Sequence, residues 1–160
     1  MKIHPITAFA LSVSTLTLAA CSSEPEQVVE TAPEGIPGLT IENPRLVLAP
    51  VAGNPAAVYF DLSYEGDRGL SLRRVDVSGA ESSAMHNYGE HAGKMQMAEA
   101  MPIALTKGTK VAFEPGGYHV MAFNLSDDVK PGGSVEVTLT VSGGDKYSFD
   151  APVRAAGDER

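Results

Sequence analysis

The sequence predicts one all-β domain, built as a β-sandwich or a Greek-key barrel, and three observations support this fold class. Short apolar runs with strand-like alternation recur from Leu39 onward, and turns rich in Gly, Pro and Asp separate them. No stretch with helical periodicity is long enough to predict a helix. The chain has 160 residues, of which 43% are hydrophobic, so it is long enough to bury a core of its own.

The predicted strands follow one another without an internal repeat. In chain order they are residues 39–41, 45–48, 56–64 and 70–77, two within 102–115, then 118–125, and two within 130–153 around the turn "SGGD". The apolar residues change phase between Leu72 and Val75, which predicts a β-bulge. The stretch "NYGEHAGK", residues 87–94, contains two glycines and is interpreted as a loop. His86 and Met97 flank this loop, and its two ends could meet as neighbouring strands.

The first 20 residues have the features of a signal peptide. Lys2 gives a weak positive charge, and an apolar stretch follows that is too short for a transmembrane helix. It ends in "LAAC", in which small residues precede Cys21. This ending resembles the bacterial lipobox, which implies cleavage before Cys21 and a diacylglycerol on its thiol. The alternative is a plain secretory signal in which the cysteine has no role.

Four segments are therefore expected along the chain. They are a lipoprotein signal peptide at 1–20, a lipidated flexible linker at 21–38, a β domain at 39–154 and a short tail at 155–160. The linker is rich in Pro, Glu and Ser and poor in large apolar residues. Because Cys21 is the one cysteine of the chain, a lipidated protein has no disulfide and no thiolate, which suits the oxidising, periplasm-facing side of the cell envelope.

The charge of the chain excludes one class of partner. A net charge of −8 without a Lys/Arg cluster predicts no nucleic-acid binding. Removal of residues 1–20 takes away Lys2, which leaves 11 basic and 20 acidic residues and a charge of −9. A domain of that charge is not attracted to anionic lipid, so the lipid on Cys21 is expected to act only as a tether to the membrane.

Methionine and histidine are concentrated in one part of the mature chain. The five methionines and three histidines beyond the signal peptide all lie between residues 85 and 121. Core methionines are expected to scatter over all strands, so packing alone does not explain this cluster. In the stretch "GGYHVMAFNL", His119 and Met121 are two residues apart, and a strand would direct both side chains to one face, which Phe123 continues.

A mixture of imidazoles and thioethers is typical of a Cu(I) site. Thioether sulfur is a soft ligand that favours Cu(I), whereas zinc recruits cysteine or carboxylate, calcium and magnesium prefer oxygen, and blue copper needs a thiolate. Each residue also has an ordinary interpretation, because a single His on a strand is usually hydrogen-bonded and a lone Met usually fills the core. Met85 faces away from His86 and is predicted to be core. Met95 and Met101 are interpreted as core or outer-shell sulfur, and His91 as a solvated loop histidine.

The spacing of these residues is similar to that of the periplasmic copper chaperones called PCuAC. The pattern of that family is a His, ten residues, a Met, twenty-one residues and then His-x-Met, and His86, Met97, His119 and Met121 agree with all three spacings. "PGGYH", residues 115–119, also resembles the family's approach to the last pair. The likeness extends from about Leu39 to Val153.

The resemblance implies a cupredoxin-like Greek-key barrel that holds one Cu(I) per chain through His86, Met97, His119 and Met121. It also implies delivery of copper toward the Cu(A) centre of cytochrome c oxidase, to subunit II or to a thioredoxin-like assembly factor. Two features differ from the family pattern. The tail "RAAGDER" has none of the Met and His residues that form a second copper site in some members, and a lipid anchor is not universal.

Two other functions are compatible with the sequence. One is a copper-resistance or storage lipoprotein that uses the same site as a sink, and the other is a structural lipoprotein without metal. An enzyme is not expected, because no nucleophile and base pair is recognisable and a superoxide dismutase would need more histidines. The predicted function is therefore a Cu(I) metallochaperone, with His91, Met95 and Met101 as additional residues that could assist transfer.

Overall fold

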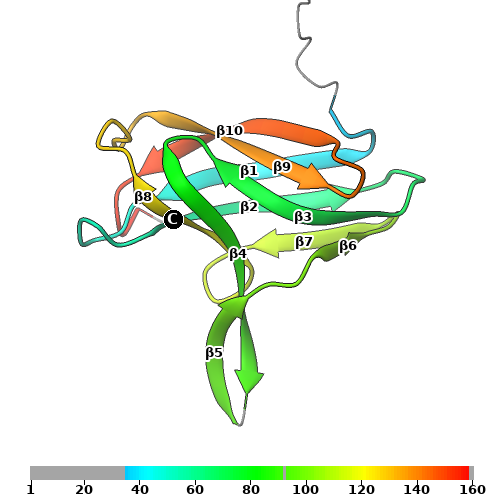
Figure 1. Cartoon of the computed structure of the whole chain (residues 1–160), viewed down its shortest axis with the longest axis horizontal. Helices are drawn as coiled ribbons and strands as arrows, with labels where there is room; N and C mark the ends of the chain where they lie inside the picture. The colour runs from blue at the N-terminus through cyan, green and yellow to red at the C-terminus, as the bar shows by residue number, and fades with distance from the viewer. Residues whose placement is uncertain (1–34, 92, 159–160) are drawn as a thin grey trace, which may run out of the picture. The chain divides into compact units, whose positions relative to one another are not determined.

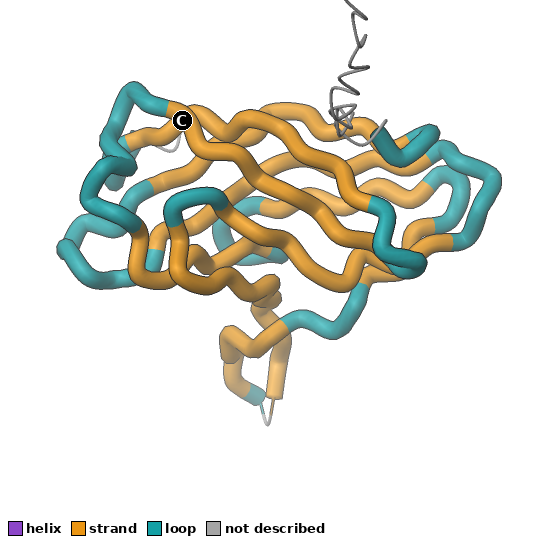
Figure 2. Tube along the Cα trace, turned by 45° about the horizontal axis from the view of Figure 1, so that its top comes forward, coloured by secondary structure: helices purple, strands orange, loops and turns teal. Residues whose placement is uncertain are grey.

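The computed structural model describes residues 35–91 and 93–158, and in this part of the chain every regular element is a strand (Figures 1 and 2). The strands are β1 (Leu39–Val47), β2 (Ala56–Tyr64), β3 (Leu70–Val77), β4 (Ala80–His91), β5 (Lys94–Glu99), β6 (Ile103–Leu105), β7 (Thr109–Phe113), β8 (His119–Leu125), β9 (Ser134–Val141) and β10 (Lys146–Arg154). The predicted all-β class is confirmed.

The strands form one continuous, open sheet that folds over on itself. Its order is β5-β4-β8-β2-β1-β10-β9-β3-β6, and β7 pairs with β2 outside this path. The pairing of β1 with β10 is parallel, and the other ladders are antiparallel. β2 pairs with β8 through Ala56–Val58 and with β7 through Phe60–Tyr64, so one strand supports two neighbours along the same edge.

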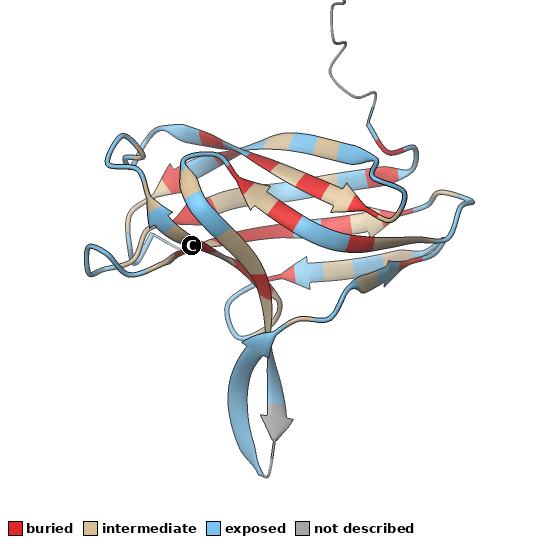
Figure 3. Cartoon of the chain, viewed as in Figure 1, coloured by how far each residue is buried: buried red, intermediate tan, exposed pale blue. Residues whose placement is uncertain are grey.

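Buried residues occur along strands of both layers of the folded sheet (Figure 3). Their side chains form one hydrophobic cluster. β9 shows the expected period of two, because Val135, Val137, Leu139 and Val141 are buried and alternate with more exposed residues. At the centre, the Phe60 ring is fully buried and stacks on Phe113 with 4.2 Å between ring centroids. This packing positions β2, which in turn pairs with β8.

Two strands contain irregularities that bend the sheet. The register of β1 against β2 shifts between Glu42 and Arg45, where Asn43 has a φ of 52° and Pro44 cannot donate a backbone hydrogen bond. The two short strands predicted on either side of this point are therefore one strand with a bulge. β3 shifts against β9 between Leu72 and Arg74, which confirms the predicted bulge.

The prediction of a loop at residues 87–94 is wrong for most of its length. The backbone of Asn87–His91 continues β4, and β5 begins at Lys94, so the segment is a tight β-hairpin. This hairpin projects from the body of the domain, below the sandwich in Figure 1. Gly89 lies inside β4, whereas Gly93 takes a φ of 75° in the turn. Only the second of the two glycines therefore indicates a turn.

Several predicted segments lie outside the described residues. These are the signal peptide, residues 21–34 of the linker with Cys21, and the last two residues of the tail. Within residues 35–91 and 93–158, no helix has the length and apolar character needed to cross a bilayer.

Candidate metal centre

The antiparallel pairing of β4 with β8 brings the two predicted histidine ligands together. His86 lies directly opposite His119 in this ladder, so both imidazoles project from the same face of the sheet. Their ring centroids are 5.9 Å apart. Met121 follows His119 by two residues on β8, opposite Ala84, and therefore lies on the same face, diagonal to His86.

The β4–β5 hairpin adds Met97 to this face. Met97 lies opposite Tyr88, which is two residues beyond His86 on β4, so the alternation of both strands directs its side chain to the histidines. The Met97 Sδ is 3.2 Å from the His119 Nε2. Two of the predicted ligands are therefore in direct contact although 21 residues separate them in the sequence.

The backbone of Gly117 fixes how His119 presents its ring. The His119 Nδ1 is 3.0 Å from the Gly117 carbonyl oxygen, which can only accept a hydrogen bond, so the Nδ1 must donate. In the neutral imidazole the Nε2 then carries a lone pair, and this lone pair faces the Met97 sulfur. A backbone carbonyl that orients a histidine in this way is typical of metal-ligating histidines.

His86 contains a buried polar atom without a partner. Among the described residues nothing hydrogen-bonds to its Nδ1, and such an atom costs about 1–3 kcal/mol unless a ligand satisfies it. Burial lowers the pKa of His86 below its ordinary value, and the nearby His119 lowers it further, whereas Glu99 acts in the opposite direction. The ring is therefore held neutral, which is the form that binds metals.

Aromatic side chains border the two histidines. The Tyr88 ring centroid is 5.6 Å from that of His119, and Phe123 meets His86 edge-on at 6.5 Å. His119 is 5% exposed, whereas Met97 on the projecting hairpin is 45% exposed. The cluster is thus closed on the side of the sheet and open on the side of the hairpin.

The remaining sequence predictions have mixed outcomes. Met85 is buried in the core, as predicted. Met95 and Met101 are 64% and 81% exposed, so the interpretation as core residues is wrong for both. The backbone of His91 ends a strand and not a loop, and its side chain lies outside the described residues, as does Cys21.

Two residues at the site were not found from the sequence, Tyr88, which contacts His119, and Glu99, which lies opposite His86. The turn formed by Gly116 and Gly117 was predicted to place His119, but the contact of the Gly117 carbonyl with its ring was not. Tyr88 follows His86 by two residues and Glu99 follows Met97 by two. The alternation would have revealed both if residues 87–94 had been interpreted as strand.

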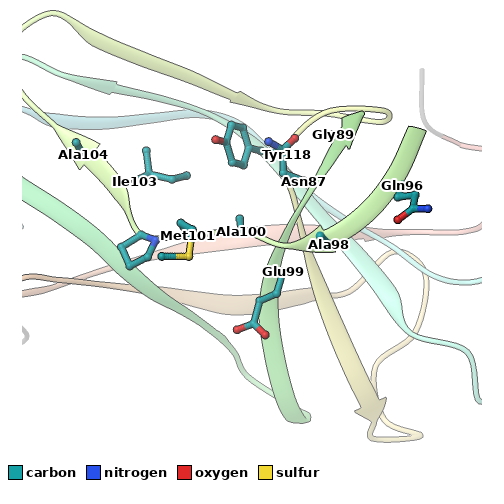
Figure 4. Close-up of a pocket in the computed structure, with 11 residues that line it drawn as sticks. Asn87, Gly89, Gln96, Ala98, Glu99, Ala100, Met101, Ile103, Ala104 and Tyr118 are labelled. Carbon is teal, nitrogen blue, oxygen red and sulfur yellow. The ribbon is translucent and has the colours of Figure 1, made fainter. Parts of the chain in front are cut away.

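The opposite face of the hairpin carries a pocket of about 560 Å³ (Figure 4). Asn87, Ala98 and Tyr118 line it together with residues 101–104. Asn87 and Ala98 lie on the face of the hairpin opposite to the histidines and methionines. Glu99, which lies opposite His86, also lines the pocket, so the pocket borders the candidate site at this carboxylate.

The donor set of the face fits a soft cation. No group of three His, Cys, Asp or Glu side chains that could hold a metal occurs among residues 35–91 and 93–158. The described face instead offers imidazole nitrogen and thioether sulfur, which are neutral ligands. Such ligands favour Cu(I) over the harder divalent ions.

Several solved structures of PCuAC domains are similar to this chain. The copper-bound PCuAC domain from PmoF2 is 24% identical, with a TM-score of 0.61 over 78% of this chain and 98% of that domain. The apo form of that domain is 25% identical, with a TM-score of 0.64 over 79% and 97%. The solution structure of CuI-DR1885 from Deinococcus radiodurans is 22% identical, with a TM-score of 0.58 over 79% and 85%. The fold is therefore the cupredoxin-like fold of PCuAC domains, and the resemblance seen in the sequence is confirmed.

A family model described as "Putative lipoprotein LpqE-like" matches residues 39–153. The chain belongs to this LpqE-like family. No curated protein matches the sequence.

Proposed function

We propose that this protein is a Cu(I) carrier of the bacterial cell envelope that binds copper and passes it to a partner protein. The observation that carries the proposal is the contact between Met97 and His119. The Met97 sulfur lies 3.2 Å from the His119 Nε2. Because the Nδ1 donates to the Gly117 carbonyl, the Nε2 of the neutral ring carries a lone pair and no hydrogen lies between the two atoms. Two such electron-pair donors favour a cation that both can bind.

The proposed ligands of one Cu(I) per chain are His86, Met97, His119 and Met121. All four are neutral, so the loaded site carries a single positive charge, which a half-buried face tolerates better than a divalent charge. The unpaired Nδ1 of His86 supports its part in binding, because a ligand would satisfy this atom. The neighbouring structures described as copper-bound and CuI forms support the choice of metal.

Transfer is proposed to occur by exchange of ligands and not by catalysis. His119 is buried and held by the backbone, whereas Met97 is half-exposed on the projecting hairpin. An incoming donor from a partner therefore reaches the site from the hairpin side, where it can replace one sulfur at a time. Weak, neutral ligands allow such replacement without a change in the charge of the protein.

The proposed partner is the Cu(A) centre of cytochrome c oxidase, reached through subunit II or through a thioredoxin-like assembly factor. The anchor is proposed to be lipid on Cys21, and the periplasm-facing membrane surface the place of transfer. The lipoprotein description of the family supports the anchor. A carrier fixed to a membrane surface suits an acceptor that is itself in the membrane.

The direct test is a competition titration with Cu(I) and a chromogenic chelator under anaerobic conditions. The full chain should carry Cys21→Ser, so that its one thiol does not bind copper. We expect one Cu(I) per chain. We expect Met97→Leu to weaken the affinity about 10- to 100-fold, by analogy with the cost of losing one metal-site group.

Met85→Leu is the matched control for this titration. Met85 precedes His86 directly but faces the core, so its replacement should leave the copper affinity unchanged. Equal affinities of the wild type, Met97→Leu and Met121→Leu would show that the site is assigned to the wrong residues.

A further inference from the structure

Exposed methionines gather on and beside the β4–β5 hairpin. The exposed large hydrophobic side chains among the described residues are Val51, Tyr88, Met95, Met97 and Met101. Four of these five belong to the hairpin or to the segment directly after it. A patch of exposed hydrophobic side chains on a small surface usually has a function. For methionines, two functions are possible, namely apolar docking of a partner or metal binding through sulfur.

Met95 is placed to act together with Met97. The two residues are separated by one position on β5, so both side chains project from the face that carries His86 and His119. Their Cα atoms are about 7 Å apart at the usual rise of a strand. Methionine side chains are long and unbranched, and two of them can therefore direct their sulfurs to one ion across this distance.

The exposure of the donors increases outward along the hairpin. His119 is 5% exposed, Met97 is 45% exposed and Met95 is 64% exposed. β5 is also an edge strand that pairs only with β4 in the described part of the chain, so nothing in the fold covers its outer side. A soft ion that enters or leaves the site along the hairpin meets Met95 before Met97.

We propose that Met95 is a transfer ligand for Cu(I), and this inference rests on the proposed function. Met95 and Met97 together form an outer two-sulfur site, from which the ion moves to His119 and the inner ligands. In the outward step, a bond between copper and the Met95 sulfur forms while a bond to an inner ligand breaks. Copper remains in the +1 state, and no proton or electron is transferred.

The test compares Met95→Leu with Met101→Leu in the full chain carrying Cys21→Ser. Leucine keeps the apolar surface and removes only the sulfur, so the comparison separates metal binding from docking. Met101 is 81% exposed, against 64% for Met95, but it follows the end of β5 and lines the pocket, which makes it the matched control. The transfer of Cu(I) from the loaded chain to excess chelator is followed by stopped-flow absorbance.

We expect Met95→Leu to slow the transfer about tenfold, which corresponds to about 1.4 kcal/mol of barrier. The equilibrium affinity should remain within about twofold of the wild type, a small free-energy change. Met101→Leu should change neither quantity. As a second readout, the ¹³C-methyl NMR signal of Met95 should shift when Cu(I) exceeds one equivalent, while that of Met101 should not.

Two results would overturn the inference. An unchanged transfer rate in Met95→Leu would mean that the side chain provides only apolar surface. A parallel loss of affinity and rate would make Met95 a resident ligand of the inner site. If the wild type itself bound no Cu(I), the proposed function would fail first, and this outcome is distinct from both.

Discussion

The imidazole of His86 lies between His119 and Glu99, and its protonation depends on both neighbours. Burial and His119 lower its pKa, and Glu99 opposes this shift. Copper competes with protons for imidazole nitrogen, so a lowered pKa extends copper binding to more acidic conditions. The lowered pKa also means that the metal-free domain keeps the contribution of His86 to stability above pH 6.5 and loses it as the pH falls through the folded-state pKa.

The first prediction concerns the opposing effects of His119 and Glu99 on the pKa of His86. Glu99→Gln removes the one influence that raises the pKa of His86, so the pKa should fall further below 6.5. The midpoint at which acid releases copper should move in the same direction. An NMR titration of the His86 ring protons in the metal-free chain measures the pKa. An increase of this pKa in Glu99→Gln would contradict the arrangement described for the site.

Among the elements, the strands that bury an alternating face were predicted from the sequence, whereas a loop was predicted over most of the β4–β5 hairpin, of which only the pairing of the ends was anticipated. β2 and β9 were predicted closely, because their apolar residues alternate and turn residues bound them. All residues of β5 are exposed, so the alternation of Met95 and Met97 on this strand does not reflect burial in the core. β5 is held by its ladder with β4, which is a tertiary feature that no local pattern encodes.

The same difference explains which parts of the candidate site were predictable. His119 and Met121 lie on a strand with clear alternation, and their common face follows directly from the sequence. The contact between Met97 and His119 depends on the register of two ladders, β4 with β5 and β4 with β8. The spacing within the family resemblance indicated that the two halves meet, but the fold was needed to place Tyr88, Glu99 and Gly117.

The second prediction concerns Gly38, which directly precedes β1 and lies against the turn that follows β2. Gly38 has a φ of 83°, its carbonyl accepts a hydrogen bond from the Glu65 amide, and an added Cβ would collide with the backbone of Gly66. Gly38→Ala should therefore lower the free energy of unfolding by at least about 3 kcal/mol. Urea denaturation monitored by circular dichroism measures the change.

Gly53→Ala is the control for this experiment. Gly53 has a similar φ of 86°, but nothing lies within 4 Å of the added Cβ. Gly53→Ala should therefore lower the free energy of unfolding only by the strain of the left-handed conformation, about 1–2 kcal/mol. Equal losses in the two variants would mean that backbone strain, and not the collision, determines the effect.

For the whole molecule, copper binding should stabilise the folded state by mass action. At free Cu(I) of about 1,000 times the dissociation constant, the gain is about 4 kcal/mol. For a domain of this size, the melting temperature should rise by roughly 10 °C. Differential scanning calorimetry of the full chain with Cys21→Ser measures this rise. The double variant Met97→Leu and Met121→Leu should lose most of it, whereas Met85→Leu should keep it.

The proposed lipid tether on Cys21 gives a further prediction for the whole molecule. If Cys21 carries lipid, Cys21→Ser should move the protein from the membrane fraction to the soluble envelope fraction of the cell. The domain should then bind Cu(I) as before, because no described ligand lies in the linker. Labelling with a radioactive fatty acid checks the modification, and equal labelling of both proteins would rule out Cys21 as its site.

In the proposed site, one Cu(I) is held by two nitrogens and two sulfurs. X-ray absorption spectroscopy of the full chain with Cys21→Ser, loaded with one equivalent of Cu(I), tests it most directly. We expect two sulfur and two nitrogen neighbours, with loss of one sulfur in Met97→Leu and no change in Met85→Leu. A spectrum with only nitrogen or oxygen neighbours, or one that is the same in all three proteins, would contradict it.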